Sequence, residues 1–341
     1  MITRRIYASI ASLLQVNSTQ LALKVAAGDR FIIQSSGYIL ILSLKLLHFE
    51  SRIINRITMQ NKALTIKVMT EKEVNIAIDW AAQEGWNPGL HDAHNYYQAD
   101  PHGFLIGYLG DEPIATISVV KYDNHFAFLG FYIVKPEYRG KGYGMQIWQA
   151  GLNYLKGCNI ALDGVLDQQA NYKKSGFKFA YSNIRFAGAG GGQLPVNNNI
   201  IELANFPFST LSAYEKPFFP VVRADFLQSW VSQPDAQAFG ILDNGKLAGY
   251  GVIRACREGF KIGPLYANTP QLAESLFLAL KAFAPEEETI YLDVPNVNQA
   301  AVALAQRHNM APAFETARMY THQQPNIPLD KVFGVTSFEI G

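Results

Sequence analysis

Three glycines spaced two apart follow an apolar stretch and lead into a helical pattern in the segment VKPEYRGKGYGMQIW, residues 134–148. A helix N-terminus leaves up to four backbone N–H groups without partners and carries the positive end of the helix dipole, so it attracts anions. Glycines let that backbone approach a phosphate closely, because no side chain stands between them. The segment therefore predicts a diphosphate site with cations nearby, formed by Arg139, Gly140, Lys141, Gly142, Tyr143 and Gly144.

The two common nucleotide-binding loops do not fit this segment. The Walker signature requires Gly-Lys followed by Ser or Thr, and here Lys141 is followed by Gly142. The dinucleotide fingerprint requires G-x-G-x-x-G, whereas these glycines alternate with single residues. A second glycine run, residues 187–192, has no strand-to-helix context. We predict a turn or linker there and place a domain boundary in it.

The elements that must position the loop follow from hydrophobic periodicity. Thr70 and Glu73 stand at capping-box spacing before a helical pattern, and Asn87-Pro88-Gly89 is a strong turn signal. The expected elements, in order, are a strand at 63–69, a helix at 70–86, a short helix at 94–99, strands at 103–110, 114–122 and 126–134, a helix at 143–157, a strand at 159–165, a short helix at 168–176 and a strand at 177–186. This order indicates an α+β domain whose middle strands form an antiparallel meander.

The second half of the chain repeats this order without repeating the residues. A hairpin is expected around Asn244-Gly245. It is followed by a strand at 260–266, a helix that begins with Pro270, a strand at 289–294, a helix at 298–309 and a strand at 314–320. The strand-to-helix junction, GPLYANTP, lacks the regularly spaced glycines, so no phosphate site is predicted in this half.

The pattern Arg-x-x-Gly-x-Gly after a strand and a proline resembles the acetyl-CoA pyrophosphate loop of the GNAT acetyltransferase superfamily. In that superfamily a Tyr stands four residues before Gly-Phe further along the chain, and NYKKSGF supplies Tyr172, Gly176 and Phe177 at that spacing. The resemblance covers residues 63–186. The stretches EGWNPG, LDGV, ANYKKSGF and VFGVTSFEIG are similar, more narrowly, to the YitH-type tandem proteins, in which a complete GNAT domain precedes a degenerate one.

The resemblance implies two tandem GNAT-like domains, each with a mixed, mostly antiparallel central sheet flanked by helices. The implied organisation is an N-terminal extension outside the core at 1–62, an acetyl-CoA-binding GNAT domain at 63–190 and a degenerate GNAT-like domain at 191–341. It also implies that the strand before the loop splays from the strand at 159–165, leaving N–H groups near Ile133 and Val134 for the pantetheine and the thioester oxygen. Tyr172 takes the position that commonly protonates the CoA thiolate. An Asn that often contacts the cofactor is absent from residues 165–168.

Acetyl transfer also needs a base, because an alkyl amine is mostly protonated at pH 7. Many superfamily members use a Glu on the fourth strand, but residues 126–134 contain no acid. Asp163 is the leading candidate, because a carboxylate in an otherwise apolar strand is costly to bury unless it is partnered or functional. A structural hydrogen bond is the alternative role for it. Further candidates near the GWNPG loop are Glu84, His91 and Asp92, although His91 and His94 suit surface or helix-cap positions better.

The loop that contains GWNPG is expected to cover the acceptor side of the cleft. The residues that would then line that side are Trp86, Asn87 and Tyr96. If the loop does not cover the cleft, Trp86 belongs to the hydrophobic core.

Charge and cysteine content limit the possible classes of protein. The chain of 341 residues is 49% hydrophobic and has a net charge of +1, which fits a globular protein of two domains. Residues 1–58 carry seven Lys and Arg against Asp29 and Glu50, whereas the remaining residues carry 22 bases and 26 acids. That acidic body argues against nucleic-acid binding by counterion release. Cys158 and Cys256 are isolated, so we expect a cytoplasmic protein with no metal site.

Residues 1–58 permit three interpretations. The apolar run at 38–49 is interrupted by Lys45 and is shorter than the ~20 residues that a membrane span needs, so it fits a partly buried segment. The Arg and Ser content and the lack of acids before Asp29 are typical of a transit peptide. We favour the third interpretation, an extension outside the working fold with Met59 as a natural start.

Together these patterns predict an acetyl-CoA-dependent N-acetyltransferase that acts on a small-molecule amine or a peptide amine, and not on a nucleic acid or a membrane. The alternative is a non-catalytic protein that binds or senses acyl-CoA. The lack of an acid in residues 126–134 favours the alternative, and Tyr172 argues against it.

Overall fold

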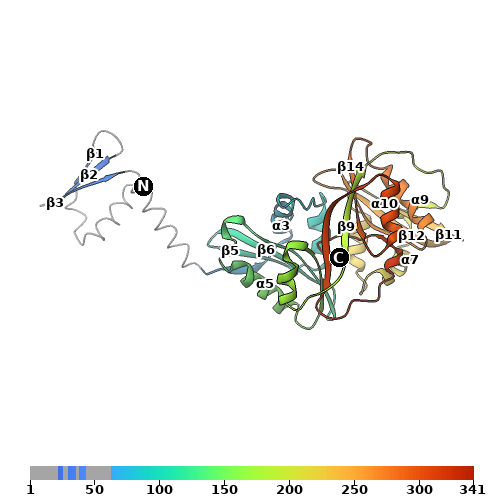
Figure 1. Cartoon of the computed structure of the whole chain (residues 1–341), viewed down its shortest axis with the longest axis horizontal. Helices are drawn as coiled ribbons and strands as arrows, with labels where there is room; N and C mark the ends of the chain where they lie inside the picture. The colour runs from blue at the N-terminus through green and yellow to red at the C-terminus, as the bar shows by residue number, and fades with distance from the viewer. Residues whose placement is uncertain (1–21, 26–29, 36–37, 44–62) are drawn as a thin grey trace. The chain divides into compact units, whose positions relative to one another are not determined.

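The computed structural model describes residues 22–25, 30–35, 38–43 and 63–341 and divides the chain into two compact units, residues 1–63 and 64–341 (Figure 1). In the first unit, β1 (Ala22–Val25), β2 (Arg30–Ser35) and β3 (Tyr38–Ser43) pair in sequence order as an antiparallel sheet. The apolar run at 38–49 therefore begins as a strand, and its remainder and Met59 lie outside the described residues. Within the described ranges, no helix is both long enough and apolar enough to cross a bilayer.

The first half of the second unit contains the expected antiparallel meander. It consists of β4 (Thr65–Val68), β5 (Phe104–Leu109), β6 (Glu112–Lys121) and β7 (Phe126–Val134), each paired with the next. Successive side chains of a strand point to opposite faces of the sheet. Ile106 therefore joins the core formed with helix α3 (Glu71–Gln83), whereas Leu105 joins the core formed with helix α5 (Tyr143–Tyr154).

Helix α3 begins as its capping box predicts. Thr70 Oγ1 accepts a hydrogen bond from the Glu73 N–H at 3.3 Å, and Glu73 Oε2 accepts one from the Thr70 N–H at 2.8 Å. Two backbone donors of the first turn are thereby satisfied, which locates the start of the helix. Helix α4 (Asp92–Ala99) follows, two residues longer than the short helix expected from the sequence.

After α5 come β8 (Asn159–Val165), α6 (Gln169–Lys174) and β9 (Lys178–Ala189), in the expected order. The prediction of a turn or linker throughout residues 187–192 is wrong for its first three residues. Ala187, Gly188 and Ala189 continue β9 and pair with the strand β14 (Thr289–Pro295). Small residues suit this position, because a Cβ added to Gly188 would lie 2.7 Å from Met310 Cγ.

The second half repeats the architecture of the first, as its order of patterns predicts. The expected elements are β11 (Ala236–Asp243), β12 (Lys246–Ala255), β13 (Phe260–Ala267), α9 (Pro270–Lys281), β14, α10 (Gln299–Arg307) and β15 (Ala311–Tyr320). The structure adds elements for which we made no prediction: β10 (Ile200–Glu202), α7 (Phe208–Glu215), α8 (Ala224–Val231) and β16 (Val332–Gly334). Helices α7 and α8 stand between β10 and β11, where the first half has α3 and α4 between β4 and β5.

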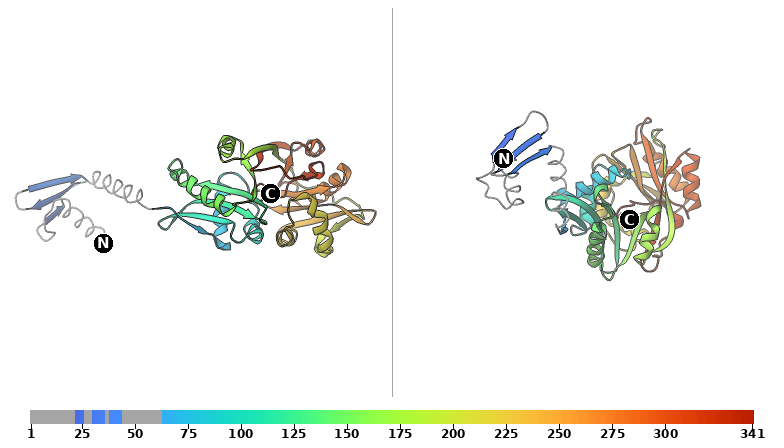
Figure 2. Two further views of the ribbon diagram at one scale, coloured as in Figure 1. Left: turned by 90° about the horizontal axis from the view of Figure 1, so that it is seen from below. Right: turned by 60° about the vertical axis from the view of Figure 1, so that its left-hand side comes forward.

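The two halves form one continuous sheet, with the order β10-β11-β12-β13-β14-β9-β15-β8-β7-β6-β5-β4. One strand of each half has crossed into the other half: β9 pairs with β14 and β15, and β15 also pairs with β8. Figure 1 draws β9 and β15 together in the middle of this unit, and the left view of Figure 2 puts the first-half elements at one end and the second-half elements at the other. The halves on either side of residue 190 therefore share their central strands.

Two ion pairs accompany this exchange of strands. Asp163 of β8 pairs with Arg318 of β15, and Asp293 of β14 pairs with Arg185 of β9. In each pair the guanidinium holds both carboxylate oxygens, at 2.8 and 2.6 Å for Asp163 and at 2.7 Å twice for Asp293. Each half thus contributes one buried Asp, which pairs with a buried Arg of the other half. We call these contacts the two exchange ion pairs.

Candidate active site

A large opening in the described part of the chain lies between β7 and β8. These parallel strands pair only from Phe126 with Asn159 to Leu129 with Leu162. Beyond that point β7 continues along β6, and β8 continues along β15, so the two strands diverge. A cavity of about 710 Å³ occupies this divergence and extends to the glycine loop, residues 139–144. The splay implied by the sequence resemblance is therefore present.

A bulge in β7 marks the inner end of the opening. The register shifts between Thr116 and Ser118 of β6, which pair with Ile133 and Gly130 of β7. Within the bulge Phe131 has a φ of +44°, in the left-handed region that a bulky residue rarely adopts. Such conformations are costly and cluster at functional sites.

The alternation of hydrogen bonds along β7 indicates which N–H groups face the opening. The N–H of Lys135 donates to Ile114 O at 3.0 Å, toward β6. Because these bonds alternate in an antiparallel pair, the N–H of Ile133 also faces β6, whereas those of Tyr132 and Val134 face the other side. The expectation for Val134 therefore agrees with the geometry. The expectation for Ile133 does not, and Tyr132 takes its place.

The glycine loop leaves its backbone donors unpaired. Gly140 and Gly142 have φ values of +73° and +84°, and Gly142 is the N-cap of α5. Within residues 63–341, the N–H groups from Gly140 to Met145 have no protein acceptor, and the first helical bond runs from the Gln146 N–H to Gly142 O at 3.3 Å. Side chains added at Gly140 or Gly142 would meet no protein atom within 4 Å, so the space above both is open. These are the properties of an anion site at a helix N-terminus.

The other members of the loop hold it in place. A Cβ on Gly144 would come within 2.5 Å of the Tyr132 hydroxyl, so this glycine allows α5 to lie close to β7. Arg139 Nε donates to Val134 O at 2.8 Å, and its guanidinium forms an ion pair with Glu84. Lys141 Nζ donates to Glu137 O at 2.6 Å. The two expected cations are therefore beside the loop and engaged with neighbouring protein atoms.

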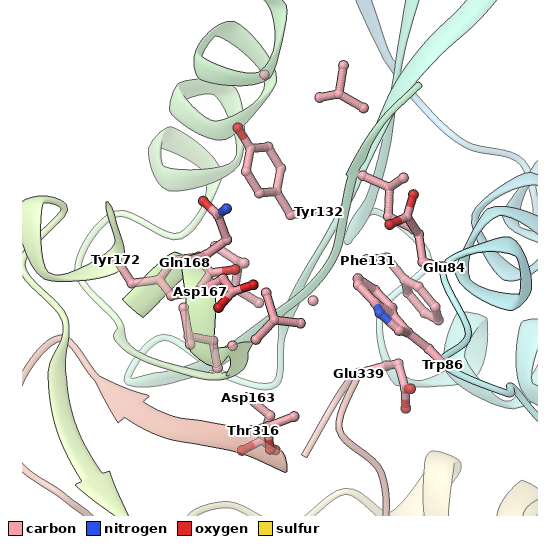
Figure 3. A pocket seen from close by; sticks show the side chains of 18 of the residues that line it. Glu84, Trp86, Phe131, Tyr132, Asp163, Asp167, Gln168, Tyr172, Thr316 and Glu339 are labelled. Atoms are coloured by element: carbon pink, nitrogen blue, oxygen red, sulfur yellow. The ribbon is translucent and has the colours of Figure 1, made fainter. Parts of the chain in front are cut away.

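Tyr172 lines the cavity from the side of α6 (Figure 3). Its ring lies against Gly164, where an added Cβ would be 2.2 Å from the ring, and it stacks on Trp148 with 5.8 Å between the ring centroids. Burial, with a smaller contribution from Tyr132, raises the pKa of Tyr172 to about 12. Its hydroxyl accepts and donates no hydrogen bond among the described residues. At neutral pH this group is a protonated phenol on the wall of the cavity.

Asp163 is not a free base. Both of its oxygens accept hydrogen bonds from Arg318, and Oδ1 accepts a third from Asn183 Nδ2 at 2.8 Å. Burial raises the pKa of Asp163, and the Arg318 guanidinium opposes that rise. The equivalent residue of the other half, Asp293, forms the same contact with Arg185. Because a half without a glycine loop has the same arrangement, we interpret Asp163 as a member of an exchange ion pair, which corrects its expected catalytic role.

The remaining base candidates of the GWNPG region are also paired. Asp92 is fully buried and binds Arg254, with Oδ1 at 2.9 Å from Nε. His91 contacts Asp235 at 2.8 Å and His94 contacts Glu71 at 2.6 Å, both near the surface. Glu84 does line the cavity, but its carboxylate is paired with the Arg139 guanidinium.

Only one of the three expected acceptor-side residues lines the cavity. Trp86 lies on its wall. The Asn87 side chain instead forms two hydrogen bonds with the backbone of Glu258, at 2.8 and 2.9 Å, and thereby fastens the loop to the second half. Tyr96 is completely buried. Its hydroxyl lies behind the cavity wall, 3.2 Å from Glu339 Oε2.

The second half supplies much of the acceptor side, which the sequence analysis did not anticipate. Residues of the second half that line the cavity, from β15 and the C-terminal segment 335–341, are Phe314, Thr316, Phe338 and Glu339, and Arg185 of β9 in the first half also lines it. Figure 3 labels Glu339 and Trp86 on the side of the cavity opposite Tyr172, with Asp163 and Thr316 below. The segment VFGVTSFEIG carried a resemblance signal, but nothing in it indicated proximity to the glycine loop. On the other side, where the cofactor-contacting Asn is absent, the wall contains Val165, Asp167 and Gln168.

Comparison with known proteins connects both halves to one family. The model described as "Acetyltransferase (GNAT) family" matches residues 73–177, and that described as "Acetyltransferase (GNAT) domain" matches residues 211–334. Holothin acyltransferase from Pseudoalteromonas sp. (strain SANK 73390) is 28% identical over 286 residues, which cover 84% of this chain and 97% of that protein.

Two solved structures have the same fold over most of both chains. A protein from Pyrococcus horikoshii, classed provisionally as an acetyltransferase, superposes with a TM-score of 0.69 at 22% identity and covers 82% of this chain and 96% of its own. A tandem GNAT protein from the clavulanic acid biosynthesis pathway superposes with a TM-score of 0.55 at 12% identity, over 77% of this chain and 100% of its own. At these identities the likeness is one of fold.

Proposed function

The chain belongs to the GNAT acetyltransferase superfamily and carries two GNAT domains in tandem, and from this premise we propose that it transfers an acetyl group from acetyl-CoA to an amine. The first half, residues 63–190, contains the reaction site, and the second half, residues 191–341, is a degenerate domain that completes the acceptor side. The observation that carries the proposal is the set of unpaired amides from Gly140 to Met145 at the end of an open cavity.

The cavity suits a coenzyme with a diphosphate and an extended amide-containing arm. The amides of the glycine loop and the N-terminus of α5 would bind the diphosphate oxygens. The pantetheine arm would follow the divergent edge of β7, where the N–H of Val134 is available. The N–H of Tyr132 would donate to the thioester oxygen and stabilise the negative charge that develops there as the amine attacks.

Tyr172 supplies the proton for the leaving group. The amine nitrogen forms a bond to the thioester carbon, the carbon–sulfur bond breaks, and the Tyr172 hydroxyl protonates the thiolate, while the amine proton passes to a base. Since the pKa of Tyr172 is raised to about 12, the phenol keeps its proton throughout the neutral range. The leaving thiolate is a weaker base than the Tyr172 phenolate, so we place the proton transfer together with the breaking of the carbon–sulfur bond, as negative charge develops on sulfur.

Aromatic side chains favour an acceptor with a compact, flat or apolar body. Trp86 and Phe131 line one wall, and Phe314 and Phe338 come from the second half. The relative named holothin acyltransferase acts on a small molecule by its name, which agrees with a small-molecule amine rather than a protein surface. A polyamine would find two of the four carboxylates on these walls, Glu84 and Asp163, already paired with arginines.

The proposal is tested by thiol release. The full-length protein is incubated with acetyl-CoA and a panel of amines, namely benzylamine, tyramine, tryptamine, spermidine and a lysine peptide, and free CoA is measured with a thiol reagent. We expect turnover with the aryl-alkyl amines and none with spermidine. If CoA raises the melting temperature of the protein but no amine is turned over, the result would support the alternative, a protein that binds or senses acyl-CoA.

A further inference from the structure

We infer that Glu339, in the C-terminal segment, binds the acceptor amine and accepts its proton, so that the degenerate half supplies the carboxylate that β7 lacks. The inference rests on the proposed function. It assigns a catalytic role to a residue about 200 positions from the glycine loop.

Four carboxylates line the cavity: Glu84, Asp163, Asp167 and Glu339. Two of them are neutralised by arginines, Glu84 by Arg139 and Asp163 by Arg318. Asp167 is exposed to solvent in the turn before α6, on the side of the cavity that holds Tyr172. Glu339 is the buried member without an ion pair, with 4% of its surface exposed, and the buried cations Arg185 and Lys261 are near enough to interact with its charge.

The backbone of the C-terminal segment is fixed beside the bulge of β7. Glu339 O accepts a hydrogen bond from Ser118 Oγ at 3.4 Å, and a Cβ on Gly130 would lie only 2.2 Å from the same oxygen. Ile340 O accepts from the Tyr122 hydroxyl at 2.7 Å, and Gly341 O accepts from Arg223 Nη1 at 2.7 Å. The segment therefore runs along the strand where β7 and β8 diverge, next to the N–H of Tyr132 that would hold the thioester oxygen.

The two oxygens of the Glu339 carboxylate have different surroundings. Oε2 accepts a hydrogen bond from Ser337 Oγ at 2.6 Å and lies 3.2 Å from the Tyr96 hydroxyl, which is also 3.0 Å from Asp92 Oδ2. Oε1 has no hydrogen-bond partner among residues 63–341, and it is absent from the set of fully buried polar atoms without partners. One oxygen thus orients the group, and the other has no partner among the described residues and is not fully enclosed by protein, in a residue that lines the cavity.

A carboxylate in this position performs two tasks. It attracts an alkylammonium ion out of water and places it beside the aromatic wall formed by Trp86 and Phe338. Oε1 then accepts one ammonium proton, the neutral nitrogen attacks the thioester carbon, and the thiolate leaves with the proton from Tyr172. The nitrogen loses its second proton to water, because that proton becomes strongly acidic once the nitrogen is bonded to the carbonyl carbon. Glu339 and Tyr172 then return to their starting protonation states by exchange with solvent, so no other reactant is required.

The test compares Glu339→Gln with Glu315→Gln in the full-length protein. Glu315 is an exposed carboxylate on β15 that does not line the cavity, so its change is a matched control. With benzylamine at pH 7, kcat/KM of Glu339→Gln should fall about 100-fold, within the range of a general base, whereas Glu315→Gln should retain wild-type activity. The dissociation constant of CoA should stay within threefold of wild type in both variants.

The pH profile separates a proton acceptor from a structural residue. The wild-type kcat/KM for benzylamine should be flat from pH 7 to 9, because the enzyme removes the proton. That of Glu339→Gln should rise about tenfold per pH unit, because only the neutral amine reacts. With aniline, which is already neutral at pH 7, the variant should lose less than tenfold. A merely structural role would produce the same loss at every pH and with both amines.

Unchanged kcat/KM of Glu339→Gln at pH 7, or a loss that is independent of pH and of amine, would overturn this inference while leaving the proposed function standing. A wild-type protein inactive with every amine would overturn the proposed function and the inference with it. If Glu339→Gln melts more than a few degrees below wild type, Glu339→Asp serves instead. It retains the carboxylate, so activity should persist with the wild-type pH profile, and loss of that profile would contradict the role of Glu339.

Discussion

The two halves of the second unit have one fold but differ at the strand-to-helix junction. In the first half, Gly142 caps α5 without a side-chain hydrogen bond, and the amides around it are unpaired. In the second half, Thr269 caps α9, its side chain accepts from the Leu272 N–H at 3.3 Å, and Pro270 at the next position has no N–H. At the start of α9, therefore, the Leu272 N–H is bonded to a side chain and Pro270 has no N–H to satisfy. At the start of α5 the backbone N–H groups are left unpaired.

The openings between the parallel strands also differ, because only the opening of the second half is occupied by another strand. Strands β13 and β14 pair only at Phe260–Ile262 with Ile290–Leu292, so they diverge as β7 and β8 do. In the second half, however, β16 pairs with β13 at Leu265 and Tyr266 and occupies the divergence. The chain itself thus fills the place that the first half leaves for a ligand.

The proton donor is also missing from the second half. Phe177 N–H donates to Tyr172 O at 3.2 Å, and in the corresponding turn Met310 N–H donates to Ala305 O at 3.0 Å, so Ala305 stands where Tyr172 does. Alignment of Asp163 with Asp293 also puts Val294 at the position of Gly164, which gives the Tyr172 ring its space. The first half thus has a large Tyr beside a small Gly, whereas the second half has a small Ala and a larger Val at the same two positions.

What the halves retain in common is structural. Both contribute one Asp and one Arg to the exchange ion pairs. Both have a glycine that the C-terminal segment passes closely: an added Cβ would lie 2.2 Å from Glu339 O at Gly130 and 2.6 Å from Val335 O at Gly263. The comparison teaches that residues shared by both halves maintain the fold, whereas the glycine loop and Tyr172, which only the first half has, are the residues to which we assign coenzyme binding and proton donation.

Gly142→Val should produce the largest effect and tests the difference between the junctions. A β-branched residue is strained at a φ of +84° and would stand between the amides and a phosphate, so CoA binding should weaken by more than about 1000-fold. Gly245→Val, at a φ of +73° in a second-half hairpin with equally open space, controls for strain. Titration calorimetry should find one CoA per chain in the wild type and in the control. Retained binding in Gly142→Val would mean that the loop is not the diphosphate site.

Asp163→Asn and Asp293→Asn test the similarity of the exchange ion pairs. Each leaves a buried Arg without its partner, which should lower the free energy of unfolding by about 3–5 kcal/mol in both cases. Denaturant unfolding measures this loss. Thiol release per folded molecule should agree between the two variants within about tenfold. A selective loss of turnover in Asp163→Asn, with Asp293→Asn active, would restore Asp163 as a base.

Tyr172→Phe should have a smaller effect, confined to turnover. Loss of the proton donor should lower kcat by about 10–100-fold while the CoA dissociation constant stays within threefold, because the ring contacts with Trp148 and Gly164 remain. Since the pKa of Tyr172 is about 12, the wild-type rate should not fall through ionisation of this phenol between pH 7 and 10. Equal kcat for the variant and wild type would remove Tyr172 from the mechanism.

Patterns of residues close together in the sequence were sufficient to predict much of this structure. The capping box at Thr70, the strand-loop-helix unit around Gly142 and the short helix that contains Tyr172 were all predicted, and each depends on contacts within a few positions. The fold of each half followed from the order of such local patterns. The unpaired amides of the loop also followed, because they result from the glycine spacing alone.

The exchange of β9 and β15 had no local signal, because a strand pattern does not specify its neighbours. Asp163 was therefore expected to be a base, although Arg318, 155 positions away, occupies it. Glu339 was not considered, although it lies 243 positions from the Tyr96 hydroxyl that it contacts. Local sequence patterns specify where helices, strands and backbone donors occur. Which carboxylate is neutralised and which is left free depends on charges brought together from distant parts of the chain, and that became apparent only when the two halves were seen sharing one sheet.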